Sequence, residues 1–114
     1  MSDKQKSFLI TGGKGFQITF ANNYTVSVQF GWGNYCDNYD NEYEQQKLNI
    51  QNGIFPKSNT AETALLDGFG EFVPYSHDDS ENYDVQGRAT AEQVLKLLVY
   101  AESLPRQEAN KDKG

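Results

Sequence analysis

Cys36 and His77 are the side chains best suited to nucleophilic chemistry, and each is the only residue of its type in the chain. A thiol nucleophile needs an adjacent base, and spacing along the chain does not place these two residues together. A buried cysteine and a histidine in a loop are the more ordinary interpretation. We therefore predict no catalytic residues, and a small enzyme that uses Cys36 and His77 remains the alternative.

Oxygen-bearing side chains at alternate positions could wrap a calcium ion, and Asp78, Ser80, Asn82 and Asp84 have this spacing. The EF-hand pattern is not met, because no glycine stands at the sixth position and no glutamate at the twelfth. A solvated acidic loop is the simpler interpretation. We predict no metal and no cofactor, with a ligand-binding or calcium-binding Asp78–Asp84 loop kept as a further alternative.

The glycine-rich run from Thr11 to Gly15 has some of the character of a phosphate-binding loop. That motif needs Ser or Thr after its lysine and a helix after that, whereas Lys14 is followed by Gly15, Phe16 and a strand pattern. The run therefore favours a tight turn between two strands over nucleotide binding.

The segment from Trp32 to Glu44 alternates aromatic residues with acids, a composition typical of protein interfaces. Residues 15–46 contain no Lys or Arg, so nothing local neutralises these carboxylates. The alternative is that the tyrosine rings cover the open end of a small β core while the acids face water. The predicted partner-binding residues are Trp32, Tyr35, Asp37, Tyr39, Asp40, Glu42, Tyr43, Glu44, Asp78 and Asp79.

The uneven charge of the chain narrows the partners that this segment could bind. The formal net charge is −6, yet Gly15 to Gly87 holds eleven acids against two lysines, which is −9. An acidic middle argues against direct contact with nucleic-acid phosphates and permits a protein partner with a basic surface. Spaced carboxylates can also imitate phosphates and occupy a basic groove. Simple solubility is the alternative explanation.

Alternating apolar residues predict strands at 7–11, 16–20 and 24–30. A three-residue loop, Ala21-Asn22-Asn23, pairs Phe20 with Tyr24, Ile18 with Val26 and Phe16 with Val28. Every apolar side chain then shares one face, as a core requires. Such a loop needs one residue in the left-handed region, and Asn23 suits that position.

The pattern weakens between Gly31 and Asn59, where we predict an ordered loop. Helical turns around Tyr35, Tyr39 and Tyr43 and a short strand over 48–50 are both compatible with the spacing. Strands are predicted over 60–66 and 69–73, joined by Asp67-Gly68, and a polar loop over 75–88. Thr90 and Gln93 form a capping box that opens a helix ending at Leu104-Pro105.

These elements predict one α+β domain: a mainly antiparallel sheet of four to five strands with one C-terminal amphipathic helix packed on it. We expect a disordered N-terminus at 1–6, the domain at 7–104 and a charged flexible tail at 105–114. The sequence has no membrane-length apolar run, no signal-peptide pattern and one cysteine, so we expect a cytoplasmic protein with no membrane partner. The expected core is Phe8, Ile10, Phe16, Ile18, Phe20, Val26, Val28, Leu65, Val94, Leu95 and Leu98.

Several runs of the sequence are also familiar in character. They are Gly15-Phe16, Phe20, Asn22, Thr25 to Gly31, Gly33 to Cys36, the alanine-rich Thr60 to Ala64, and the final Gly, Thr cap and helix. With these, the chain over about residues 7–104 resembles small uncharacterised proteins of bacteriophages and prophages. The resemblance transfers no catalytic residue. It implies an accessory protein that binds and inhibits a host defence or nucleic-acid-processing protein.

Overall fold

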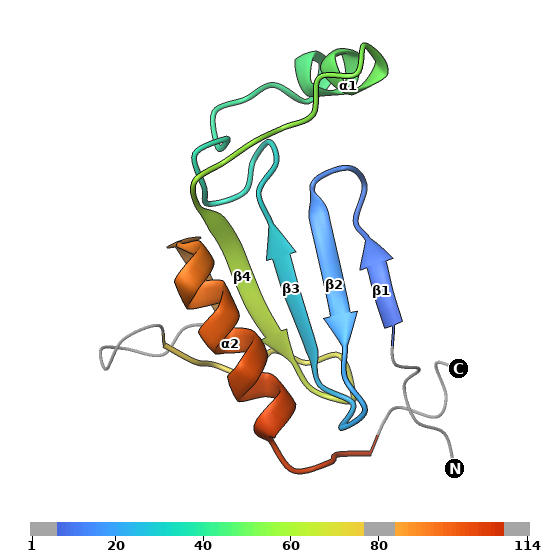
Figure 1. The fold of residues 1–114 in the computed structure, drawn as a ribbon, viewed down its shortest axis with the longest axis vertical. Coiled ribbons are helices and arrows are strands. Elements are labelled where there is room, and N and C mark those ends of the chain that lie inside the picture. Colours follow the sequence, from blue (N-terminus) through green and yellow to red (C-terminus); the bar gives the residue numbers. More distant parts are fainter. Residues whose placement is uncertain (1–6, 77–83, 109–114) are drawn as a thin grey trace.

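The computed structural model describes residues 7–76 and 84–108, which form an antiparallel sheet and two helices (Figure 1). The strands lie in chain order across the sheet. Their bounds are β1 Ser7–Ile10, β2 Gly15–Thr19, β3 Thr25–Gln29, β4 Ala61–Leu66 and β5 Val85–Ala89, and the helices are α1 Tyr43–Gln51 and α2 Ala91–Ser103. The predicted α+β class, the mainly antiparallel sheet of four to five strands and the packed C-terminal helix are confirmed, and the sheet has five strands.

The β2–β3 hairpin has the predicted register, in which Ile18 pairs with Val26 and Phe16 with Val28. The loop is closed by the Phe20 amide, which donates to the Tyr24 carbonyl at 2.9 Å. Asn23 takes a φ of 74°, the left-handed conformation that this three-residue loop requires. The alternation of apolar residues was therefore sufficient to set the register.

The core lies between α2 and strands β3, β4 and β5, the three strands that the helix contacts. Cross-strand pairing of Val26 with Leu65 places these two fully buried residues beneath Leu97 and Ala101 of the helix. The helix begins as predicted: the Thr90 side chain accepts from the Gln93 amide, and the Gln93 side chain accepts from the Thr90 amide.

Three residues of the predicted core are in fact exposed. Phe8 and Ile10 are 84% and 81% exposed, and Leu95 is 60% exposed. Phe8 and Ile10 stand on the same sheet face as Val26 and Val28, but α2 does not extend over β1. One helix of 13 residues covers only part of a five-stranded sheet, and sequence alternation says which face a residue takes but not whether anything covers it.

Three predicted elements were also wrong. Residues 48–50 belong to α1, because β3 pairs directly with β4 and leaves no place in the ladder for a strand between them. Residues 69–73 make only one bridge, between Leu66 and Phe72, because β5 takes the place beside β4. That strand lies inside the predicted 75–88 loop, and its sequence, with one large apolar residue, gave little strand signal.

The chain after α2 is anchored for at least part of the predicted flexible tail. The Gln107 amide donates to the Asn22 carbonyl at 3.0 Å, and the Gly68 amide donates to Gln107 Oε1 at 3.2 Å. Gln107 is therefore bonded to the turns at one end of the sheet. The predicted disorder of residues 1–6 falls outside the described part of the chain. Within that part, no helix has the length and hydrophobicity needed to cross a membrane.

Candidate protein-binding site

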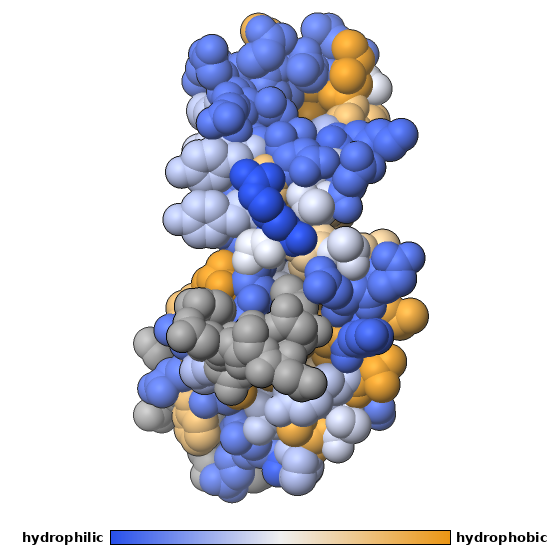
Figure 2. Space-filling view, turned by 90° about the vertical axis from the view of Figure 1, so that its left-hand side faces the viewer, coloured by the Kyte–Doolittle hydropathy of each residue, from blue (hydrophilic) through white to orange (hydrophobic). Residues whose placement is uncertain are grey.

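The acid-rich and aromatic segment predicted from sequence joins β3 to α1 at one end of the sheet (Figure 1). Hydrophilic residues cover most of this end of the molecule on the face that Figure 2 shows, with a smaller hydrophobic group to one side. The backbone between Phe30 and Glu42 turns repeatedly without forming a helix or strand. What holds this loop in one shape decides whether its exposed side chains form a defined surface.

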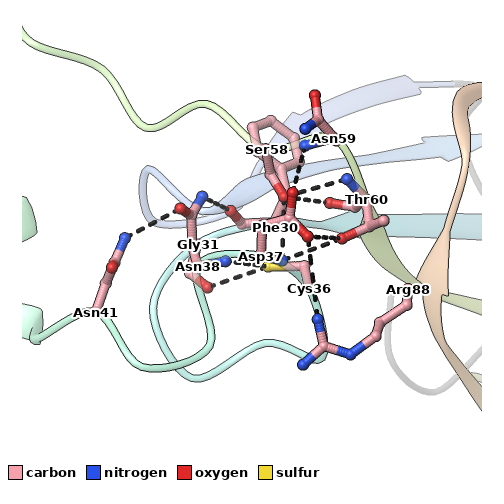
Figure 3. A network of polar contacts seen from close by, with 10 residues as sticks. All are labelled: Phe30, Gly31, Cys36, Asp37, Asn38, Asn41, Ser58, Asn59, Thr60 and Arg88. Atoms are coloured by element: carbon pink, nitrogen blue, oxygen red, sulfur yellow. Dashed lines mark hydrogen bonds and ion pairs between the residues drawn. The ribbon is translucent and has the colours of Figure 1, made fainter.

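Cys36 anchors the loop from inside, since its side chain is fully buried (Figure 3). Its Sγ lies 3.7 Å from the Gly31 carbonyl oxygen as a donor, and the Asn38 amide donates to the same sulfur at 3.3 Å. The Asn38 side chain in turn donates to the Phe30 carbonyl at 2.6 Å. Buried polar atoms that are paired in this way hold the loop in one shape, a role that an apolar core plays elsewhere.

Asn34 and Glu62 tie the loop to the sheet. The Asn34 side chain accepts from the Gly31 amide at 3.1 Å and donates to Glu62 Oε1 at 2.9 Å. The second oxygen of Glu62 accepts from the Tyr35 amide at 3.3 Å. The Glu62 carboxylate, which belongs to β4, is therefore a structural acceptor that orients the first half of the loop.

Asp37 holds the loop to the segment that enters β4 (Figure 3). One oxygen of its carboxylate accepts from the Thr60 hydroxyl at 2.9 Å, and the other accepts from the Asn59 amide at 3.1 Å. Arg88 of β5 brings its guanidinium to 4.0 Å from the same carboxylate. Nothing near Asp37 in the sequence neutralises its charge, but the fold brings a cation from residue 88 to it.

Tyr35 and Tyr39 form an exposed stacked pair, with ring centroids 5.4 Å apart and an interplanar angle of 10°. Tyr35 is pinned to β5, because its carbonyl accepts from the Arg88 amide at 2.8 Å. A Cβ atom at Gly87 would lie 2.8 Å from the Tyr35 Cβ, so only glycine allows this close approach. The two rings are 54% and 44% exposed and are thus displayed rather than buried.

Trp32 and Tyr43 form a second aromatic pair, with centroids 5.0 Å apart at 58°. The Lys14 ammonium lies 4.1 Å from the centre of a Trp32 ring, a cation–π contact. Gln46, a buried residue of α1, accepts from the Trp32 amide at 2.9 Å. This pair fastens α1 to the loop, which favours a structural role for Trp32.

A cavity of about 340 Å³ lies between the end of the loop and the segment after α1, and its lining includes Asp40, the residue that follows Tyr39 in the sequence. Asp40 and Glu42 supply its carboxylates, and the segment after α1 supplies Ile54 and Phe55, which are 61% and 70% exposed. The remaining lining residues are Asn41, Gln45, Gln46, Asn49 and Pro56. The cavity thus combines two carboxylates, several amide groups and an apolar wall.

This arrangement suits a long cationic side chain. The methylenes of an arginine or lysine can pack on Phe55 while the charged head meets Asp40 and Glu42. A guanidinium can also stack on an exposed tyrosine ring. Within the described residues, no group of three or more His, Cys, Asp or Glu side chains is placed to hold a metal ion.

The structure divides the predicted site residues into three sets. Tyr35, Tyr39, Asp40 and Glu42 are exposed on the same loop; Glu44 is exposed in the first turn of α1. Asp37, Trp32 and Tyr43 hold the loop. Asp78, Asp79 and His77 fall outside the described residues, as does most of the predicted Asp78–Asp84 loop.

Ile54 and Phe55 were missed from the sequence. The available signal was an apolar pair placed between Asn52-Gly53 and Pro56, with no strand or helix pattern to absorb it. Because no helix or strand turns Ile54 and Phe55 toward the core, both side chains are exposed to solvent. We use the name tyrosine–acid surface for these two residues together with the exposed Tyr35, Tyr39, Asp40 and Glu42.

No protein-family model matches the sequence, and comparisons with the curated proteins and with the solved structures find no match either. Function is therefore inferred from the chain's own residues and contacts.

Proposed function

We propose that this chain is a non-enzymatic protein-binding domain that uses the tyrosine–acid surface to bind a host protein through a basic patch. The observation that carries the proposal is that one loop carries both the exposed Tyr35–Tyr39 stack and the acids Asp40 and Glu42, which line a cavity. Exposed aromatic rings next to exposed acids supply both the apolar anchor and the charge that interfaces use.

The fixed shape of the loop supports this proposal. Cys36 and Asn38 hold the backbone through buried or half-buried hydrogen bonds, and Asp37 and Glu62 hold it through exposed ones, so the loop that carries the rings is ordered before a partner arrives. A surface that is already ordered loses less conformational entropy on binding. A loop that served only to cover the sheet would need its aromatic rings turned inward, whereas these two rings face out.

The charge of the chain points to the kind of partner. Asp40, Glu42 and Glu44 stand at alternate positions and are exposed, and none of the three is in a described ion pair. Carboxylates spaced in this way can occupy a groove that normally holds nucleic-acid phosphates. The resemblance to phage and prophage proteins supports a host defence or nucleic-acid-processing protein as the target, inhibited by blockage of that groove.

Comparative capture tests the proposal. The full chain is immobilised and exposed to lysate of a host bacterium, in parallel with an Asp40→Lys/Glu42→Lys variant and a Tyr35→Ala/Tyr39→Ala variant. We expect a protein that the parent retains and both variants lose, and that added double-stranded DNA displaces if the acids imitate phosphates.

A charge-matched control separates this surface from acidity in general. Glu102→Lys/Glu108→Lys changes the net charge equally at two exposed positions far from the loop in sequence and fold. This variant should retain the same protein as the parent. If all four baits retain the same proteins, or if the control loses them too, the tyrosine–acid surface is not the binding site.

A further inference from the structure

The first strand, β1, is an apolar strand at the edge of the sheet with nothing described beside it (Figure 1). Phe8, Leu9 and Ile10 are 84%, 55% and 81% exposed. Phe8 and Ile10 lie on the face that carries α2, beyond the reach of that helix, and Leu9 lies on the opposite face. Both sides of the strand therefore present apolar side chains to solvent.

The backbone of β1 can accept another strand. The Thr11 amide donates to the Gly15 carbonyl at 3.0 Å, so the backbone groups of residue 11 face β2. Because these directions alternate along a strand, Leu9 also faces β2, while the N–H and C=O groups of Phe8 and Ile10 point away from the sheet. Two donors and two acceptors thus line the outer edge.

The opposite edge of the sheet is protected in the ways that edge strands usually are. Strand β5 carries a charged residue, Arg88, at a φ of 53°, and its pairing with β4 is irregular between Ala61 and Thr63. Its Arg88 amide is already bonded to the Tyr35 carbonyl of the loop. Strand β1 has no charge, proline or irregular pairing, features that normally prevent edge-to-edge association.

The residues outside the described ranges carry few apolar side chains that could cover this edge. Residues 1–6, 77–83 and 109–114 contain almost no apolar side chains: one methionine, one tyrosine and one alanine. Residues 4–36 contain no Asp or Glu but do contain Lys4, Lys6 and Lys14. Two copies that meet at the β1 edge therefore avoid carboxylate repulsion but bring lysines together, so the pairing has to come from the backbone groups and the apolar side chains.

We infer that two copies of this chain associate through β1, antiparallel, to form one continuous sheet. The two-fold register that uses every outward backbone group pairs Phe8 of each copy with Ile10 of the other, which gives four hydrogen bonds. The same register sets the Phe8 and Ile10 side chains against each other on one face and Leu9 against Leu9 on the other. The pairing is short, so the association is concentration-dependent.

Sedimentation velocity of the full chain over about 5 to 500 μM tests the inference, at concentrations that cover weak interfaces of this size. We expect a reversible monomer–dimer equilibrium in the parent. Phe8→Glu and Ile10→Lys, each at an exposed position, should raise the dimer dissociation constant at least about tenfold while the melting temperature stays near that of the parent. A parent that stays monomeric throughout overturns the inference.

Mixing Phe8→Glu with Ile10→Lys tests the register. In a mixed dimer, the carboxylate introduced at position 8 of one copy would stand opposite the ammonium introduced at position 10 of the other. The second pair, Ile10 against Phe8, stays intact, so the mixture should associate again. Val99→Lys, at an exposed position on α2, should self-associate like the parent. Loss of association in Val99→Lys, or mixed variants that stay apart, would show that the copies do not pair through β1 in this way.

Discussion

Asp37 shows how far one carboxylate's role depends on residues distant in sequence. Among the described acids of its segment it is the one whose oxygens are engaged, by the Asn59 amide and the Thr60 hydroxyl, with Arg88 nearby. A carboxylate used in this way helps to organise a loop. Asp40, three residues on, is exposed and lines the cavity.

This difference predicts unequal costs for two similar substitutions. Asp37→Ala should lower the free energy of unfolding by about 1–2 kcal/mol, because the Asn59 amide and the Thr60 hydroxyl lose an acceptor. Asp40→Ala should change it by less than about 0.5 kcal/mol, as for an exposed side chain. Urea denaturation of both variants measures these values. Equal effects would mean that the Asp37 contacts do not hold the loop.

Tyr75 lies buried at the edge of the core with its hydroxyl bonded to Thr63. Burial raises its pKa to about 12, against a smaller lowering by the Thr63 hydrogen bond. The unfolded chain loses this proton near pH 10, whereas the folded chain keeps it to about pH 12. The stabilising contribution of neutral Tyr75 is therefore complete below pH 10 and is lost as the pH rises through this window.

The matched variant isolates that contribution. At pH 8 the free energy of unfolding of Tyr75→Phe should be about 1 kcal/mol lower than that of the parent, because the variant lacks the hydrogen bond to Thr63. The difference in free energy of unfolding between the two proteins should narrow from pH 10 upward, because only the parent has a hydroxyl at position 75 that ionises on unfolding. Parallel stability curves over about pH 8–11.5 would contradict the account of Tyr75.

At the scale of elements, what sequence predicted well was local. The β2–β3 register followed from alternation and one left-handed Asn23, and the start of α2 followed from Thr90 and Gln93. Both depend on residues within a few positions of each other. Interactions of this kind are visible in the sequence because the partners are fixed by chain geometry.

What sequence did not predict was non-local. Strand β5 forms because β4 has an open edge, and its own residues carry little strand propensity. The exposure of Phe8 and Ile10 depends on how far α2 extends across the sheet. The cavity of the candidate site needs Phe55 beside Asp40, which are fifteen positions apart and joined only by the fold of α1.

The capping box gives a prediction at this scale. Thr90→Ala should lower the free energy of unfolding by about 1 kcal/mol, because the Gln93 amide loses its acceptor at the N-terminus of α2. Thr90→Ser keeps the hydroxyl and should lower the free energy of unfolding by only a few tenths of a kcal/mol. Thermal or urea denaturation compares the two variants with the parent. A serine variant as unstable as the alanine variant would show that the hydroxyl is not what matters.

At the scale of the whole molecule, the exposed features lie in different places. The tyrosine–acid surface is at the α1 end, while the apolar edge of β1 is a side of the sheet (Figure 1). Self-association through β1 would leave the tyrosine–acid surface of each copy open and present it twice. A dimeric binder of this form gains avidity for a partner that is itself repeated.

The association rate of the captured host protein tests the central proposal most directly. It is measured against NaCl concentration for the parent, for Asp40→Lys/Glu42→Lys and for the charge-matched Glu102→Lys/Glu108→Lys. Attraction between the acids and a basic patch predicts that the parent associates more slowly as salt rises, and that the first variant is at least about tenfold slower with a flatter salt dependence. The control should stay close to the parent. Equal rates and equal salt dependence for all three proteins would contradict the proposal that Asp40 and Glu42 recognise the partner.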